Sequence, residues 1–325
     1  MKKKLVIVLM CLFCAFLSAQ EEAETKADAK PQKDFQNHVV PVLGFQALQT
    51  DEKDFIFTPN AAVQFVRTKS EGVESAQPDT IMAAASYSQL ISTVGYGVDE
   101  IKNLHALSLM GNIAFGKNMI TAMFSNSGKQ LFSSNSTLTG GLMYTRELIN
   151  NDSFNFRLGI GVMAGDFNLK IAGYYIYVIP LPVFSLSYTS EYFNSSLSMM
   201  GLPSLSMTLF PKSIVRVKGQ CGIAGFSSIR DLTFDCAIAY HPFAKKTGGD
   251  FLSFSAGVMN QHSSFTPDRN ERNTFQYYSV YGEINASFIV LRGGYNFNGK
   301  KIHNDEVVSD LHKGVFASIQ AMYMF

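Results

Sequence analysis

His262 and Ser264 are the two residues whose types and spacing come closest to nucleophilic chemistry. Side chains two positions apart on an extended strand project from the same side, so the imidazole could accept the hydroxyl proton. Glu271 could orient that imidazole. The stretch HSSFTPDRNERN around them is also typical of a solvated surface loop. Because the pattern is so short, the solvated loop is the favoured interpretation and a hydrolytic site is the alternative.

A second group of candidates is charged and falls on segment faces that otherwise consist of Ser, Ala, Gly, Thr and Met. Such side chains could line a conduit and select solutes, or they could pair across strands to satisfy buried charge. For Glu283 and Arg292 the pairing interpretation is favoured. The group comprises Arg157, Arg216, Lys218, Asp231, Asp235, Glu283 and Arg292.

Other chemistries lack the residues that they need. The sequence contains no Gly-rich phosphate loop, no paired CxxC and no HExxH, so we expect no nucleotide cofactor and no metal site. Lys and Arg number 27 against 26 Asp and Glu, which leaves no electrostatic footprint for nucleic acid. We therefore expect no cofactor and no nucleic-acid partner.

The amino terminus has the pattern of a secretory signal. Three lysines at residues 2–4 precede the apolar run Leu5–Leu17, and small residues follow. We assign residues 1–19 to a signal peptide. Residues 20–37 are charged, Ala-rich and interrupted by Pro31, which predicts a disordered periplasmic tether.

From residue 38 onward, the dominant hydrophobic period is two, which indicates β-strands. Only 16% of the chain is charged whereas 46% is hydrophobic. No later apolar stretch reaches the length of a spanning helix, and only a closed barrel can otherwise satisfy backbone hydrogen bonds in hydrocarbon. We predict an all-β fold: a single transmembrane antiparallel up-and-down β-barrel over residues 38–325, with 12–16 strands and 14 as the best estimate.

The strand register of two predicted hairpins can be tested by asking whether the side chains placed opposite each other match in polarity or charge. Folding Tyr278–Phe297 about Ser287 places Glu283 opposite Arg292 on one face and apolar residues opposite each other on the other face. A similar hairpin places Cys221 opposite Cys236 on the apolar face, within reach of a disulfide. Two lipid-facing thiols are an equal alternative.

These features together resemble the transmembrane β-barrels of bacterial outer membranes. The resemblance implies that the terminal aromatics Tyr323 and Phe325 form the signal for the barrel-assembly machinery, and that outer-membrane lipid surrounds the chain. Gly282-Glu283 with residues 291–295 resembles the late hairpin of fatty-acid-transporter barrels. Residues 177–182 are similar to segments of lipid A palmitoyltransferase barrels, and the His-x-Ser triplet resembles that of lipid A deacylase barrels.

The expected function is therefore an outer-membrane channel or transporter for passive diffusion of small or hydrophobic solutes, porin-like and without enzymatic chemistry. Two alternatives remain open at this point. One is a lipid A modifying barrel enzyme, a deacylase or acyltransferase. The other is a surface adhesin or structural barrel with a plugged lumen. The sequence leaves open whether the barrel forms a homo-oligomer.

Overall fold

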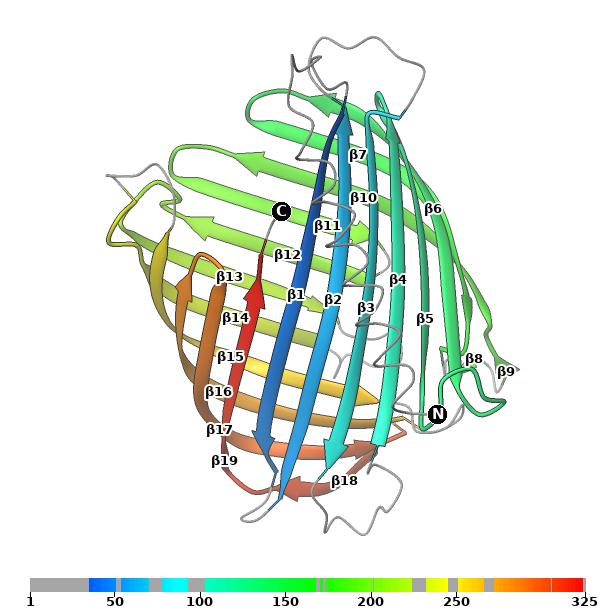
Figure 1. The fold of residues 1–325 in the computed structure, drawn as a ribbon, viewed down its shortest axis with the longest axis vertical. Helices are drawn as coiled ribbons and strands as arrows, with labels where there is room; N and C mark the ends of the chain where they lie inside the picture. Colours follow the sequence, from blue (N-terminus) through cyan, green and yellow to red (C-terminus); the bar gives the residue numbers. More distant parts are fainter. Residues whose placement is uncertain are drawn as a thin grey trace, which may run out of the picture. The chain divides into compact units, whose positions relative to one another are not determined.

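Antiparallel strands follow one another around a barrel, each paired with its neighbours in the sequence (Figure 1). This computed structural model describes residues 35–50, 54–69, 78–92, 103–167, 170–171, 174–200, 202–223, 232–244, 251–265, 272–304 and 306–323. The barrel strands are β1 (Phe35–Gln49), β2 (Phe55–Lys69), β3 (Thr80–Ser92), β4 (Asn103–Phe115), β5 (Asn118–Gly128), β6 (Thr137–Asn150), β7 (Phe154–Gly165), β10 (Val178–Thr189), β11 (Phe193–Met200), β12 (Leu202–Leu209), β13 (Val215–Ile223), β14 (Leu232–Tyr240), β15 (Leu252–Phe265), β16 (Asn273–Ala286), β17 (Ile289–His303) and β19 (Gly314–Met322). Three short strands lie outside this ring: β8 (Lys170–Ile171), β9 (Tyr174–Tyr175) and β18 (Glu306–Leu311).

The last strand closes the ring. In β19, Ser318 lies opposite Arg292 of β17 on one side and opposite Gln46 of β1 on the other. Strand β1 also pairs with β2. The sheet contains 17 strands, and because β18 pairs only with β17, the ring itself has 16. The predicted all-β, antiparallel, up-and-down barrel is confirmed, whereas the estimate of 14 strands is wrong.

The missing strands were segments that look too short in the sequence. Strands β11 and β12 have eight residues each, and β5 has 11. Each is paired along both edges, so its backbone groups are satisfied by its neighbours even where its own alternating pattern is brief. Strand β1 begins at Phe35, whereas the sequence predicted a barrel start at residue 38.

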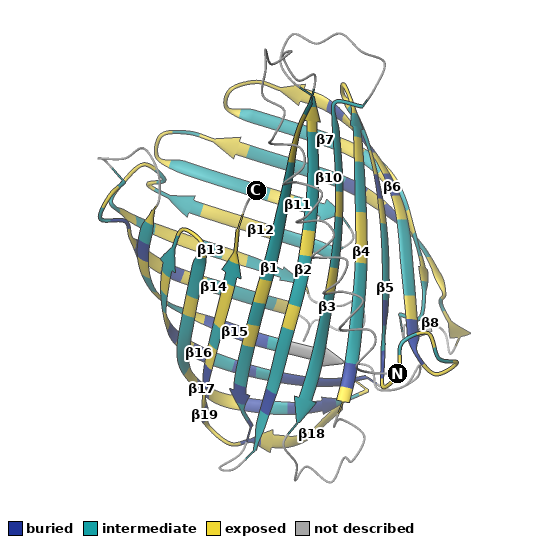
Figure 2. Ribbon diagram, in the orientation of Figure 1, coloured by how far each residue is buried: buried dark blue, intermediate teal, exposed yellow. Residues whose placement is uncertain are grey.

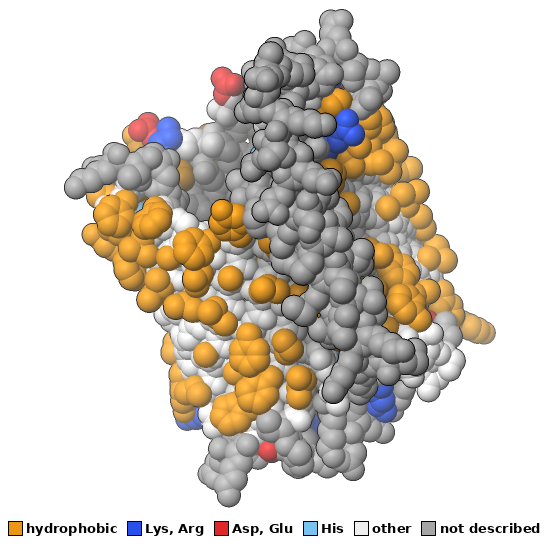
Figure 3. Space-filling view, viewed as in Figure 1, with side chains coloured by type: hydrophobic (Ala, Val, Ile, Leu, Met, Phe, Trp, Pro, Cys, Tyr) orange, Lys and Arg blue, Asp and Glu red, His pale blue; other side chains and the backbone are white. Residues whose placement is uncertain are grey.

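The two faces of the barrel wall differ sharply in polarity. On β7, Leu158, Ile160 and Val162 are exposed, with 73% of Ile160 accessible, and they alternate with Arg157, Gly159 and Gly161. Large apolar side chains are likewise exposed on most of the other barrel strands, and they form broad patches on the described surface in Figure 3. We call this apolar side the outer face and the opposite side the inner face. An outer face of this kind is suited to hydrocarbon rather than to water.

The ends of the barrel are distinguished by the chain termini. With an even number of strands, β1 starts and β19 finishes at the same end, as the opposition of Val42 and Met322 shows. We call this the terminal end. The turns at Gly116–Lys117 and Ser287–Phe288 lie at the same end, since an even number of strands separates each from either terminus.

Inner-face apolar side chains gather toward the opposite end. Figure 2 shows buried residues concentrated around β16, β17 and the neighbouring ends of β1 and β4. We call this group the apolar cluster. It consists of Leu48, Ile56, Leu104, Ala237, Met259, Phe275, Tyr277, Tyr281, Leu311 and Phe316, with Leu90 packed against it.

Candidate functional site

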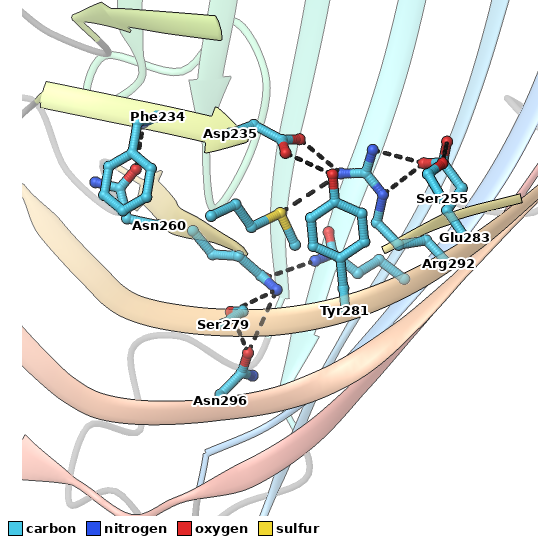
Figure 4. Close-up of polar contacts among 12 residues, drawn as sticks. Phe234, Asp235, Ser255, Asn260, Ser279, Tyr281, Glu283, Arg292 and Asn296 are labelled. Carbon is cyan, nitrogen blue, oxygen red and sulfur yellow. Dashed lines mark hydrogen bonds and ion pairs between the residues drawn. The ribbon is translucent and has the colours of Figure 1, made fainter. Parts of the chain in front are cut away.

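Arg292 is the centre of an ionic group on the inner face (Figure 4). Its Nε donates to Glu283 Oε2 at 2.7 Å, and its Nη2 lies 2.6 Å from the same oxygen. The two residues are direct cross-strand partners in β16 and β17, so the register holds both charges together. The predicted opposition of Glu283 and Arg292, with the turn at Ser287–Phe288, is confirmed.

Two more strands contribute to this group. Arg292 Nη1 lies 3.4 Å from Asp235 Oδ2 of β14, and Tyr281 Oη donates to Asp235 Oδ1 at 2.5 Å. The Arg292 guanidinium also lies over the Tyr281 ring, 4.5 Å from its centroid. Ser255 Oγ of β15 donates to Glu283 at 3.4 Å. Together with the Ser255 and Tyr281 hydroxyls, two carboxylates and one guanidinium thus link the four consecutive strands β14–β17 and leave a formal charge of −1.

A neutral network lies beside this ionic group. Ser279 Oγ donates to Asn296 Oδ1 at 2.5 Å, and Gln261 Nε2 donates to both residues at 3.3 and 3.4 Å. Gln46 Nε2 of β1 donates to Gln261 Oε1 at 3.2 Å, so the network crosses the closure of the barrel. These hydrogen bonds tie β1, β15, β16 and β17 together on the inner face, although Asn296 Nδ2 is buried without a hydrogen-bond partner.

A second ion pair lies on another part of the inner face. Arg157 Nη2 donates to Glu147 Oε2 at 2.8 Å, and Asn155 Nδ2 donates to the same oxygen at 3.0 Å. Glu147 is opposite Arg157 in β6 and β7. Arg157 therefore has a carboxylate partner, which the sequence analysis missed. The signal was available in the sequence, because folding the chain at the short turn 151–153 places Glu147 opposite Arg157.

Strands β12 and β13 are accessible on both faces. In β12 the consecutive residues Leu205, Ser206 and Met207 are all exposed, although neighbouring side chains point to opposite faces. In β13 the consecutive residues Val217 and Lys218 are likewise both exposed. Side chains therefore do not fill the barrel interior beside these strands. We call the inner face of β12 and β13 the open wall.

The predicted charged residues fall into separate places. Asp235, Glu283 and Arg292 lie together in the ionic group, and Arg157 pairs with Glu147. Arg216 and Lys218 lie two residues apart on the open wall. Arg216 Nε donates a hydrogen bond to Ser213 O. Asp231 lies outside the described residues. Tyr281 is a member of the ionic group that sequence reasoning overlooked. Its position two residues before Glu283, on the same face, was the available signal.

The expected opposition of the two cysteines is wrong. Cys221 lies opposite Phe234, and Cys236 lies opposite Gly219, so the two thiols are displaced by two residues along the strands. Both cysteines are free. A two-residue slip keeps every side chain on its own face, so the alternation of polar and apolar residues could not detect it.

The remaining sequence candidates are only partly described. His262 and Ser264 lie in β15, opposite Gln276 and Thr274 of β16, rather than in a loop. Glu271 is outside the described residues, as is Phe325, while Tyr323 is exposed directly after β19. In the described part of the chain, no group of His, Cys, Asp and Glu could hold a metal ion. No helix within the same residues is long and apolar enough to cross a bilayer.

The fold and its apolar outer face define the class of protein. A closed ring with an even number of antiparallel strands, exposed apolar side chains outside and polar groups inside is a transmembrane β-barrel of the bacterial outer membrane. No protein-family model matches the chain, and no curated protein matches it.

Several solved structures are similar in outline. OccAB4 of Acinetobacter baumannii aligns with 92% of this chain and 100% of its own at 9% identity, with a TM-score of 0.35. OmpT of Vibrio cholerae aligns with 91% of this chain and 100% of its own at 9% identity and a TM-score of 0.32. OprB of Pseudomonas putida aligns with 90% and 94% at 9% identity and a TM-score of 0.27. Because these scores are low, the class follows from the barrel's own closure and outer face.

Proposed function

We propose that the protein is a channel for passive diffusion of small solutes across the outer membrane, without chemistry on the solute. The observation that carries this proposal is the exposure of both faces of β12 and β13. One face contacts lipid, so the other must contact water inside the barrel. An interior lined there by Ser206, Lys218 and Gln220 offers a wetted route past a rigid wall.

The apolar cluster limits how wide this route can be. Phe275, Tyr277 and Phe316 are each at most 4% exposed, so side chains rather than water occupy their part of the interior. We therefore place the route along the open wall, away from the part of the interior that the apolar cluster fills. This arrangement supports small solutes rather than large substrates.

Conductance in planar bilayers tests the proposal. The refolded full chain should carry a stable ion current. A bulky side chain on the open wall, Ser206→Trp, should reduce that current, whereas Leu205→Trp on the outer face of the same strand should leave it unchanged. A bilayer that stays silent with correctly folded protein would overturn the proposal, as would equal currents from wild type and Ser206→Trp.

A further inference from the structure

The inner-face carboxylates of the barrel strands are all engaged by arginine. Glu147 lies 2.8 Å from Arg157, Glu283 lies 2.6 Å from Arg292, and Asp235 lies 3.4 Å from Arg292. No other Asp or Glu occurs in the 16 strands of the ring. Two arginines therefore compensate two of these three carboxylates, and one net negative charge remains, at the group around Arg292.

Lys218 differs from these charged residues. Its side chain is exposed on the inner face of β13, and its cross-strand neighbours are Thr208 and Ala237, neither of which is acidic. It makes no hydrogen bond or ion pair with another described residue. Arg216 adds a second positive charge two positions earlier on the same face. The ammonium of Lys218 is thus an uncompensated charge in the open part of the lumen.

The surroundings of Lys218 can donate hydrogen bonds to an anion. Strands β11, β12 and β13 contain no Asp or Glu. Their inner-face residues include Ser206 and Thr208, which carry hydroxyls, and Gln220, which carries an amide. Ser206 lies opposite Gln220, and Gln220 is two residues after Lys218 on the same face of β13. A small anion passing there meets one ammonium and several neutral donors. The nearest carboxylate in the register is Asp235, opposite Gln220, and it accepts from Tyr281 and lies 3.4 Å from Arg292.

We propose that the channel prefers small anions to cations and that Lys218 is the residue that sets this preference. The proposal deepens the channel function and rests on it. Physically, a fixed positive charge beside a narrow aqueous route raises the local concentration of anions and lowers that of cations. The ionic group around Arg292 keeps a formal charge of −1, but Lys218 and Arg216 together place two positive charges on the open wall, so the balance there still favours anions.

Reversal potentials in a KCl gradient test the proposal, with chloride as the anion probe. Wild type should be more permeable to chloride than to potassium. Lys218→Gln should lower the chloride-to-potassium permeability ratio by about fourfold, because one unit charge acting through water at about 5 Å and screened by about 0.15 M salt changes the local concentration of each ion about twofold, in opposite directions. Lys218→Glu should favour potassium, and Lys218→Arg should retain the chloride preference. High salt should weaken the preference of wild type, because screening shortens the reach of the charge.

The matched control is Arg146→Gln. Arg146 is exposed on the outer face of β6, so this substitution makes the same charge change on the wrong side of the wall and should leave the ratio unaltered. A conducting wild type with equal permeabilities, or a ratio that Lys218→Gln does not move, overturns the anion proposal and leaves the channel intact. Absence of any conductance overturns both proposals. If Lys218→Gln fails to fold, Lys218→Glu decides, because a role for Lys218 predicts a preference for potassium and the absence of a role predicts the wild-type ratio.

Discussion

Glu283 Oε2 and Arg292 Nη2 lie 2.6 Å apart across strands β16 and β17, and the same arginine reaches Asp235 on β14 at 3.4 Å. One guanidinium therefore serves two carboxylates inside a membrane-embedded wall. Removing the cation would leave both negative charges close together without compensation, which costs more than the pair itself contributes.

Arg292→Gln should lower the free energy of unfolding by about 1–3 kcal/mol, less than for a fully buried pair because Arg292 is partly exposed. Urea unfolding in phospholipid vesicles measures the change. The double variant Arg292→Gln with Glu283→Gln should recover part of the loss, since only one unpaired carboxylate remains. If the single variant had the same free energy of unfolding as wild type, the ionic group would not stabilise the barrel.

Ile160→Arg on the outer face of β7 should destabilise the folded barrel by about 2–4 kcal/mol, because it places a charge in hydrocarbon near the middle of a strand. Ser206→Arg on the open wall should cost less than about 1 kcal/mol, since water in the lumen can solvate the guanidinium. Equilibrium folding into vesicles measures both. Equal costs would contradict the assignment of inner and outer faces.

Gly294→Ala should be destabilising by about 1–3 kcal/mol through overpacking. A Cβ at Gly294 would collide with Val280 O and would lie 2.7 Å from Phe316 Cε1, and the colliding oxygen belongs to a paired backbone. Gly293→Ala is the matched control, because its Cβ would meet Phe316 O at an ordinary 3.6 Å. Thermal unfolding in detergent compares the two variants, and an equal shift would contradict the close approach at Gly294.

Introducing Phe234→Cys should allow a disulfide with Cys221, since these residues are direct partners in β13 and β14. Wild type should show no bond between Cys221 and Cys236, which are offset by two residues. Mass spectrometry of unreduced peptides distinguishes the two cases. A native Cys221–Cys236 bond would instead support the register that the sequence predicted.

The two predicted hairpin registers show when side-chain patterns can specify strand pairing and when they cannot. Around Ser287, the opposition of Glu283 to Arg292 and of Gly282 to Gly293 discriminated between registers, and the prediction is confirmed. Around residues 224–231 no charged pair singled out one register, and a two-residue slip preserved the apolar face. The stretch 262–273, expected to be a solvated loop, contains the end of β15. Hairpin pairing continues there although the hydrophobic alternation has ended.

The sequence by itself determined the class of fold and which side chains face lipid, because the period of two is local and each residue's polarity reports its own face. Only the tertiary structure decided that there are 16 strands, that Asp235 and Tyr281 join Arg292, and that the wall around Lys218 stays open. Those features depend on which strands lie beside one another and on how the closed wall packs inside, and neither is encoded within any single strand.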